Sequence, residues 1–317
     1  MSRRGDRPMV PRAEFRSYYG QPIVRPAPWT HDIASYLFTG GLAAGSALLA
    51  AGGQLTRRPR LRRTGRVAAL GAVAASGYFL VADLGRPERF LNMLRVAKPT
   101  SPMSMGTWIF SAFSGAAGVA AVAEVAPLLP ASFLRRVLPP AGAVAGLGAA
   151  AVAPALATYT AVLLADTATP SWHVAYPELP FVFAGSALAS GAGVGLIADP
   201  VPATRRMAVL GAALELYGAH RIETTKGILS EPYATGRAGR LLRVGRALTA
   251  AGVAGAVLGR RSRVVSALSG LSLLAASAVT RFGIFEGGMA SARDPKYTVL
   301  PQRERLAGRV PDGPPPD

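Results

Sequence analysis

Long apolar runs alternate with short charged connectors along most of the 317-residue chain. Most of these runs reach the ~20 apolar residues that a helix needs to cross a ~30 Å hydrocarbon layer. The second and sixth runs are shorter and end in charged residues, whose side chains can reach the membrane surface. We therefore predict an all-α integral membrane protein with eight transmembrane helices, at Ile33–Gly53, Gly65–Ala82, Met105–Leu128, Ala141–Ala165, Leu179–Ala198, Ala203–Ala219, Leu241–Leu258 and Val264–Phe285.

A short sequence echo links the first and fifth runs. The first contains Tyr36-Leu-Phe-Thr-Gly-Gly-Leu-Ala-Ala-Gly, and the fifth contains Phe181-Val-Phe-Ala-Gly-Ser-Ala-Leu-Ala-Ser-Gly. Because four spans separate their starts, a repeat would relate two four-helix bundles in parallel orientation. The predicted organisation is a polar N-terminal tail, two four-helix bundles and a polar C-terminal tail, with both tails irregular. Their ranges are 1–32, 33–165, 166–285 and 286–317.

The composition limits the chemistry that the chain can perform. Its 35 Lys and Arg against 17 Asp and Glu give a formal net charge of +18. Such a charge often marks a nucleic-acid-binding protein, but here the basic residues cluster between the apolar runs, as they do in membrane proteins. We therefore predict no nucleic-acid partner. The absence of cysteine excludes disulfides, Cys-ligated zinc and an iron–sulfur cluster held by this chain, and the three histidines leave little basis for a metal site.

The rare polar residues gather on one side of the predicted membrane. If the runs alternate in direction, one face holds both termini and the loops after the second, fourth and sixth runs; we call it the termini face. The opposite, short-loop face is basic and nearly free of acids, so we expect the termini face to lie outside the cytoplasm. Tryptophans often form an interfacial belt, but a belt would occupy both faces. The termini face holds all six His and Trp residues: Trp29, His31, Trp108, Trp172, His173 and His220.

Two carboxylates lie where the membrane makes charge costly. Asp83 ends the second run, in the segment Asp83-Leu-Gly-Arg-Pro, and must be paired or face a wet cavity. Arg86 or Arg89 could pair with it, as a structural salt bridge at the helix end. Glu215 is the most deeply placed acid, and an intramembrane acid indicates function by default. The alternative for Glu215 is a buried hydrogen-bonded pair that fixes helix packing.

Other polar residues of the termini face could line a site with them. His31 precedes Ser35 by one helical turn, and Ser35 precedes Thr39 by another, so the three form one stripe along the first span. Tyr159 lies two turns inside the end of the fourth span. Trp108 opens the third span, and His220 follows the sixth.

Several segments together resemble the NrfD/PsrC family, the membrane-anchor subunits of polysulfide reductase-like molybdenum enzymes. They occur in the same order over nearly the whole chain, and the Asp-Leu-Gly-Arg-Pro block is the most specific. The matching segments are Tyr36-Leu-Phe-Thr-Gly-Gly-Leu-Ala-Ala-Gly-Ser, Ala82-Asp-Leu-Gly-Arg-Pro-Glu-Arg-Phe-Leu-Asn-Met-Leu, Ser101-Pro-Met-Ser-Met-Gly-Thr-Trp, Tyr159-Thr-Ala-Val-Leu-Leu with Pro170-Ser-Trp172, Ser186-Ala-Leu-Ala-Ser-Gly191 and Ser291-Ala-Arg-Asp-Pro-Lys-Tyr297.

The resemblance implies a multi-pass protein of the cell membrane, in contact with lipid and without haem, that binds a quinone such as menaquinone, or its quinol, near one face. It implies electron exchange with a ferredoxin-like iron–sulfur subunit docked on the termini face, and through it with a molybdopterin catalytic subunit. The matching pocket residues are His31, Asp83 and Tyr159: His31 and Tyr159 would donate to the quinone carbonyls, and Asp83 would exchange protons with water. Further candidates for the pocket are Arg86, Trp108, Glu215 and His220.

Two other functions stay open from the residues alone. A secondary transporter would also use parallel repeats and intramembrane acids. A haem-b cytochrome would need axial histidines that face each other, and His31 and His220 are the candidates. The charged positions crowd one end of the predicted bundle rather than its midplane, which favours the anchor subunit.

Overall fold

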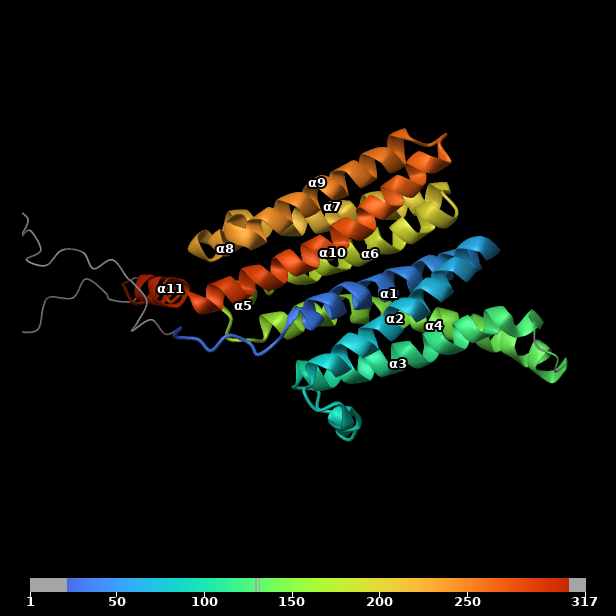
Figure 1. The fold of residues 1–317 in the computed structure, drawn as a ribbon, viewed down its shortest axis with the longest axis horizontal. Coiled ribbons are helices and arrows are strands. Elements are labelled where there is room, and N and C mark those ends of the chain that lie inside the picture. Colours follow the sequence, from blue (N-terminus) through green and yellow to red (C-terminus); the bar gives the residue numbers. More distant parts are fainter. Residues whose placement is uncertain (1–21, 129, 131, 308–317) are drawn as a thin grey trace, which may run out of the picture.

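The computed structural model describes residues 22–128, 130 and 132–307, and within them all regular structure is helical. Long helices run side by side along the length of the molecule (Figure 1). Short 3-10 and α-helical segments connect them: η2 (Pro87–Leu94), η3 (Ala123–Leu128), α5 (Pro170–Val174), η4 (Gly227–Ser230) and α8 (Glu231–Ala234). The long helices are α1 (His31–Leu55), α2 (Pro59–Asp83), α3 (Pro102–Val122), α4 (Ser132–Ala165), α6 (Leu179–Ala198), α7 (Pro202–Thr225), α9 (Gly236–Leu258) and α10 (Arg263–Arg293).

In the described part of the chain, 7 helices are long and apolar enough to cross a membrane: α1, α2, α3 with η3, α4, α6, α9 and α10. The protein is therefore a multi-pass membrane protein. The remaining predicted span, 203–219, lies in α7, which has 24 residues but is not among the seven. The reason is its charge: between Arg206 and Arg221 the apolar stretch is short, and Glu215 interrupts it.

The helices begin earlier than the apolar runs indicate. α2 begins at Pro59 rather than Gly65, and α4 begins at Ser132 rather than Ala141. A proline in the first helical turn loses no hydrogen bond, because the N–H groups of that turn have no partner within the helix. Capping acts at other helix starts: the Thr30 side chain accepts a hydrogen bond from the backbone N–H of Asp32. The first turns of these helices are therefore helical although they lie outside the apolar runs of the sequence.

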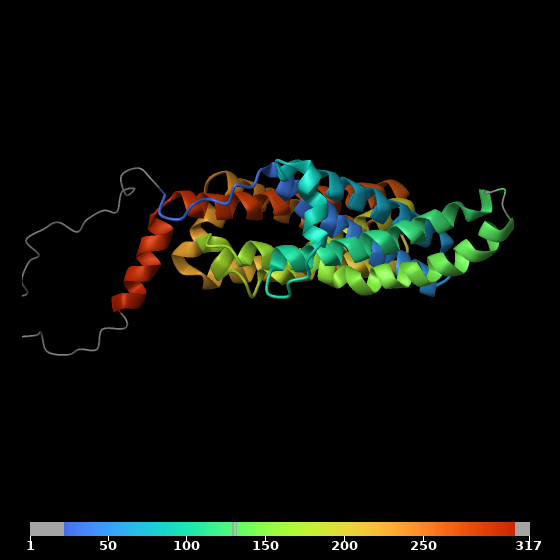
Figure 2. The same ribbon diagram turned by 90° about the horizontal axis from the view of Figure 1, so that it is seen from below.

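The region after Phe285, expected to be irregular, is largely helical as far as the structure describes it. α10 continues to Arg293 because Gly287, Met289 and Ala292 keep its inner face buried. The helix stops there because the next residue, Asp294, is extended and precedes a proline, which disfavours a helical residue in front of it. α11 (Lys296–Ala307) then turns away from the bundle axis (Figure 2). Residues 1–21 and 308–317, the outer parts of both predicted tails, lie outside the described residues.

Helix pairing in one half of the bundle is matched in the other. α1 packs on α2 and α4, and α3 packs on α4; correspondingly, α6 packs on α7 and α10, and α9 packs on α10. The halves meet where α1 crosses α6. A Cβ added at Gly45 would overlap the backbone of α6, and one added at Gly191 would overlap that of α1. Small residues permit this close approach of helices where lipid supplies no hydrophobic drive for association. The two echoing segments of the sequence therefore contact each other at the centre of the molecule.

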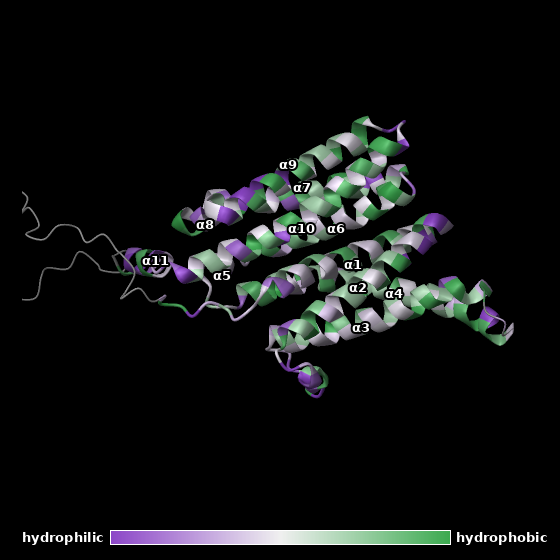
Figure 3. Cartoon of the chain, viewed as in Figure 1, coloured by the Kyte–Doolittle hydropathy of each residue, from purple (hydrophilic) through white to green (hydrophobic). Residues whose placement is uncertain are grey.

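Hydrophilic residues lie mainly near the ends of the long helices and along the first half of α9, and the middle of the bundle is predominantly hydrophobic (Figure 3). Large apolar side chains such as Val144, Leu268 and Leu271 are exposed on its outer surface. In a soluble protein such residues would be a liability, but in a bilayer they face lipid. The polar side chains that could form a functional site are therefore at the ends of the bundle or among its few buried polar groups.

Candidate functional site

A cavity of about 70 Å³ lies among α1, α2, α3 and α4 at the end of the bundle that carries the termini. We call it the Asp83 cavity. Its walls are mostly apolar, and a few polar groups point into it, which is the usual make-up of a site for a small organic ligand. It brings together Asp83 and Tyr159, which the sequence places on different spans. The lining residues are Trp29, Ile33, Tyr36, Leu80, Asp83, Leu84, Met93, Met103, Gly106, Thr107, Tyr159 and Leu163.

Asp83 joins the end of α2 to the start of α1. Its Oδ1 atom accepts a hydrogen bond from the Thr30 hydroxyl at 2.9 Å and another from the Thr30 backbone N–H at 3.1 Å. Arg86 and Arg89 are both exposed, and neither forms an ion pair with Asp83 among the described residues, so the structure does not contain the helix-end salt bridge that was the alternative interpretation of Asp83. The reason is the turn at Gly85, where a φ of +64° directs the following residues away from α2.

Tyr159 packs on α3 through a glycine. A Cβ added at Gly106 would overlap the ring of Tyr159, so the absent side chain makes room for that ring. The ring is half-buried, and its hydroxyl makes no hydrogen bond to any residue that the structure describes. Tyr36, in the wall of the cavity, is buried and contacts Phe110 edge to face, with 6.2 Å between ring centroids. Tyr159 therefore keeps a free phenolic donor within the cavity wall.

His31 does not line the Asp83 cavity. Its Nε2 atom lies 2.7 Å from Oε1 of Glu286 on α10, and its ring stacks on Phe282 with 6.0 Å between centroids. The cause is helical register: Ile33 and Tyr36 face the cavity, and a residue two positions before Ile33 points to the other side of the helix. The side chain of His31 is 55% exposed, and Arg237 lies 3.5 Å from the same Glu286 oxygen.

Trp108 and His220 also point elsewhere. Trp108 is 41% exposed, and its indole Nε1–H donates to the Val96 backbone oxygen at 3.5 Å, although its neighbour Thr107 lines the cavity. His220 is exposed on α7, in the other half of the bundle. His31 and His220 make no contact with each other, so this arrangement does not support the pair of axial ligands that a haem would need.

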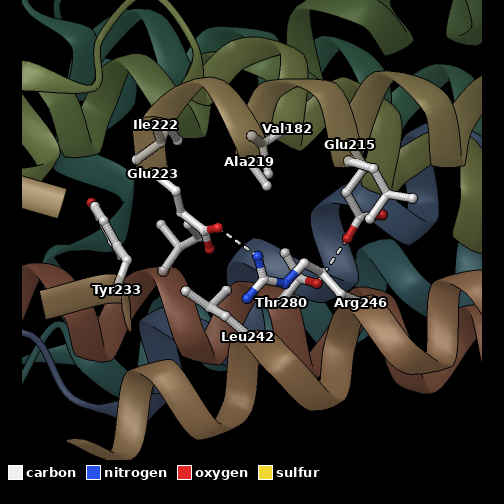
Figure 4. A pocket seen from close by; sticks show the side chains of 11 residues that line it. Val182, Glu215, Ala219, Ile222, Glu223, Tyr233, Leu242, Arg246 and Thr280 are labelled. Atoms are coloured by element: carbon white, nitrogen blue, oxygen red, sulfur yellow. Dashed lines mark hydrogen bonds and ion pairs between the residues drawn. The ribbon is translucent and has the colours of Figure 1, made fainter. Parts of the chain in front are cut away.

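A second cavity, of about 20 Å³, contains Glu215 (Figure 4). Glu215 is 3% exposed, and its Oε1 atom accepts a hydrogen bond from the Thr280 hydroxyl at 2.7 Å. This is the bond that the packing interpretation of Glu215 expects. Nearer the end of α7, Glu223 and Arg246 form an ion pair with 2.5 Å between Oε2 and Nη1. Glu215 and Glu223 lie on α7, Thr280 on α10 and Arg246 on α9, so this cavity belongs to the second half of the bundle.

Arg281 is a buried charge that the sequence reasoning missed. It has no exposed surface, its Nη2 atom donates to the Phe183 backbone oxygen at 2.8 Å, and its guanidinium carbon lies 3.7 Å from the centroid of the Phe183 ring. Its Nε and Nη1 atoms and Oε2 of Glu215 are buried without a hydrogen-bond partner in the structure. The signal was present: Arg281 is the single charge within the predicted span Val264–Phe285.

Of the seven residues proposed from the sequence, Asp83 and Tyr159 share the first cavity and Glu215 lines the second. The other four, His31, Arg86, Trp108 and His220, line neither cavity.

A comparison with protein families finds one that matches most of the chain. The family described as "Polysulphide reductase, NrfD" matches residues 23–230, a segment that contains Asp83, Tyr159 and Glu215. Arg281 and Thr280 lie beyond it. A comparison with curated proteins finds no match to the chain.

Proposed function

Because the chain belongs to the polysulphide reductase NrfD family of membrane subunits, we propose that it binds quinone or quinol in the Asp83 cavity and serves as the membrane anchor of an oxidoreductase complex. It exchanges electrons between the membrane quinone pool and an iron–sulfur subunit docked on the termini face. A molybdopterin subunit completes the electron path. The observation that carries the proposal is the meeting of Asp83 and Tyr159, from two helices, in one mostly apolar cavity.

The residues of the cavity suit the chemistry of a quinol. Oxidation of a quinol releases two electrons and two protons, and reduction of a quinone consumes them. The free Tyr159 hydroxyl donates a hydrogen bond to a quinone oxygen. Asp83 is half-buried at the end of α2, where its carboxylate can take a proton from the substrate and release it to water. Ile33, Leu80 and Leu84 offer apolar surface to the ring.

The cavity must widen to admit a quinone ring. Its volume of about 70 Å³ is well below the ≈300 Å³ at which ligand pockets usually begin. Two of its lining residues, Met93 on η2 and Met103 on α3, have unbranched and flexible side chains that adapt to a ligand. We assign the opening to movement of these two methionines and of η2, which leaves the bundle after Gly85.

The electrons must leave this chain through a partner. The sequence has no cysteine, so an iron–sulfur cluster in contact with the quinone site has to be held by another subunit. The termini face offers an open groove of about 740 Å³ between α5 and α11, lined by residues that include His173, Tyr297 and Arg305. α11 is tied to α8 by an ion pair, with 2.8 Å between Lys296 Nζ and Glu231 Oε1. We place the iron–sulfur subunit on this end.

We infer that α7 is an eighth span and that α6, α7, α9 and α10 repeat α1 to α4 in parallel orientation, which the matching helix pairs support. Glu215, the carboxylate near mid-span of α7, is buried against neighbouring helices, so it need not face lipid. Because the short loops are basic and nearly free of acids, we infer that the termini face lies outside the cytoplasm.

The test is quinol-dependent electron transfer by the complex in proteoliposomes. The proposal predicts that quinol oxidation and reduction of the terminal acceptor both require this chain, and that both fail when Asp83 and Tyr159 are replaced together. The alternative of a secondary transporter would be supported by solute uptake into vesicles that contain this chain alone, with quinol oxidation unaffected by the replacements.

A further inference from the structure

A groove of about 600 Å³ opens on the short-loop face between the start of α7 and the end of α9. Three arginines and four uncharged residues line it, with no acidic residue among them. They are Pro202, Arg205, Arg206, Val209, Leu210, Val257 and Arg260. Nothing in the proposed quinone chemistry uses this groove, which lies at the opposite end of the bundle from Asp83.

The arginines of the groove have no acidic partner. Among the described residues, no ion pair includes Arg205, Arg206 or Arg260. Backbone oxygens hold two of them: Arg205 Nη2 donates to the Arg260 oxygen at 3.2 Å, and Arg260 Nε donates to the Val257 oxygen at 2.9 Å. The Nε–H of Arg205 is buried and has no acceptor. The groove therefore presents three positive charges, and one N–H group without an acceptor, to which an anion can bind.

The contrast with the other half of the short-loop face is informative. There, the carboxylate of Glu124 accepts from Arg62 Nε at 2.7 Å and from Arg66 Nη1 at 2.9 Å. Glu124 is thus a counterion for these arginines within the chain itself. The groove at α7 and α9 has the same kind of charge without the acid, so its counterion must come from outside the chain.

Below the arginines the groove wall is apolar and open to lipid. Leu210 lies one helical turn after Arg206 on α7, on the same face, and it is 66% exposed. Tyr217 follows two turns later on that face and is also exposed. The groove thus has cationic side chains at the membrane surface and exposed apolar side chains further along α7. This arrangement matches a phospholipid with its phosphate at the interface and its acyl chain along the helix.

We propose that this groove is a binding site for an anionic phospholipid. The phosphate accepts hydrogen bonds from Arg205, Arg206 and Arg260, and one acyl chain lies along Val209 and Leu210. A soluble acidic protein would satisfy the arginines but would leave the exposed apolar side chains of Val209 and Leu210 in contact with its own polar surface. The bilayer offers both halves of the ligand in one molecule, already at the right depth.

The experiment uses the full chain purified in detergent and titrated with phosphatidylglycerol, with bound lipid counted by native mass spectrometry. The variant is Arg205→Gln with Arg206→Gln. The matched control is Arg135→Gln with Arg136→Gln, because both are exposed arginines at the start of α4 on the same face. We expect phosphatidylglycerol to bind the groove variant about 30-fold more weakly than the parent protein and the control to bind as the parent does.

Two further arms separate the sources of phosphate. Phosphatidylcholine should be retained much less than phosphatidylglycerol, and millimolar inorganic phosphate should not displace the bound lipid. Equal loss in both variants, no loss in either, or displacement by inorganic phosphate would each overturn the site. If the double variant does not fold, Arg206→Gln alone decides: its side chain is exposed and makes no hydrogen bond among the described residues, and we expect about fivefold weaker binding.

Discussion

Replacement of Asp83 by asparagine separates the chemical role of this side chain from its structural one. In the structure, a single oxygen, Oδ1, accepts both hydrogen bonds from Thr30, at 2.9 and 3.1 Å. Asparagine offers one carbonyl oxygen of the same shape, so both bonds can persist. What is lost is their charge assistance and the capacity to accept a proton.

The two losses differ in size. Hydrogen bonds to a charged group contribute about 1.5–3 kcal/mol against about 0.5–1.5 kcal/mol for neutral ones, so we expect Asp83→Asn to lower the free energy of unfolding by about 1–2 kcal/mol. Loss of a positioned proton acceptor typically reduces the rate 10²- to 10⁴-fold, which corresponds to roughly 3–5 kcal/mol in the activation barrier. The effect on turnover should therefore exceed the effect on stability.

The assay is oxidation of a menaquinol analogue by the complex in proteoliposomes, followed by absorbance, with membrane insertion and thermal unfolding measured on the same preparations. Thr30→Val is the matched control, because it removes the side-chain bond at 2.9 Å and leaves the carboxylate in place. We expect this control to lose stability and to keep most of its turnover. Normal turnover by inserted Asp83→Asn protein would refute the assignment of Asp83 as proton acceptor.

Three further changes test the rest of the account. Tyr159→Phe removes the free hydroxyl and should weaken binding of a quinone-site inhibitor by about tenfold, the value of one hydrogen bond of ~1.4 kcal/mol; an unchanged inhibitor titration would speak against this donor. Gly106→Ala places a methyl group against the Tyr159 ring and should cost about 1–3 kcal/mol of stability together with a loss of inhibitor binding, whereas a variant that binds normally would show that the ring is not part of the site. Lys296→Met breaks the ion pair with Glu231 and should reduce co-purification of the iron–sulfur subunit without changing inhibitor binding; full retention of that subunit would place the partner elsewhere.

The helical architecture follows from the sequence because the bilayer imposes it. A run of about 20 apolar residues has few alternatives to a spanning helix, since every backbone group must be hydrogen-bonded within the segment. Helix ends are less predictable. Pro59 and Ser132 begin helices several residues before the apolar runs, in exposed stretches that contain arginines, and the hydropathy of the sequence does not mark these starts.

The site was partly predictable, and the failures have a geometric cause. Asp83 lies at the end of the second span and Tyr159 two turns inside the end of the fourth, both toward the termini face, and the structure brings them into one cavity. His31 has the right height in the membrane but the wrong rotation, because two residues along a helix change direction by about 200°. Its partner Glu286 lies on α10, more than 250 residues later, and no local pattern could indicate that contact.

Two charged side chains, Glu215 and Arg281, are buried in the second half of the bundle. Arg281 and Glu215 bring opposite charges into the bundle, each with hydrogen-bonding atoms that have no partner in the structure. Such groups are costly in a low-dielectric interior unless they are paired or hydrated. The hydrogen bond from Thr280 and the packing of Arg281 on Phe183 offset part of that cost.

The central claim is that quinone binds among α1 to α4 beside Asp83. A photoreactive menaquinone analogue, bound to the complex in its membrane and activated by light, tests this claim most directly when the labelled peptides are identified by mass spectrometry. The account predicts labels on Met93, Met103 or Tyr159, and their loss when an excess of unmodified menaquinone is present. Labels confined to α7, α9 or α10, around Glu215, would contradict it.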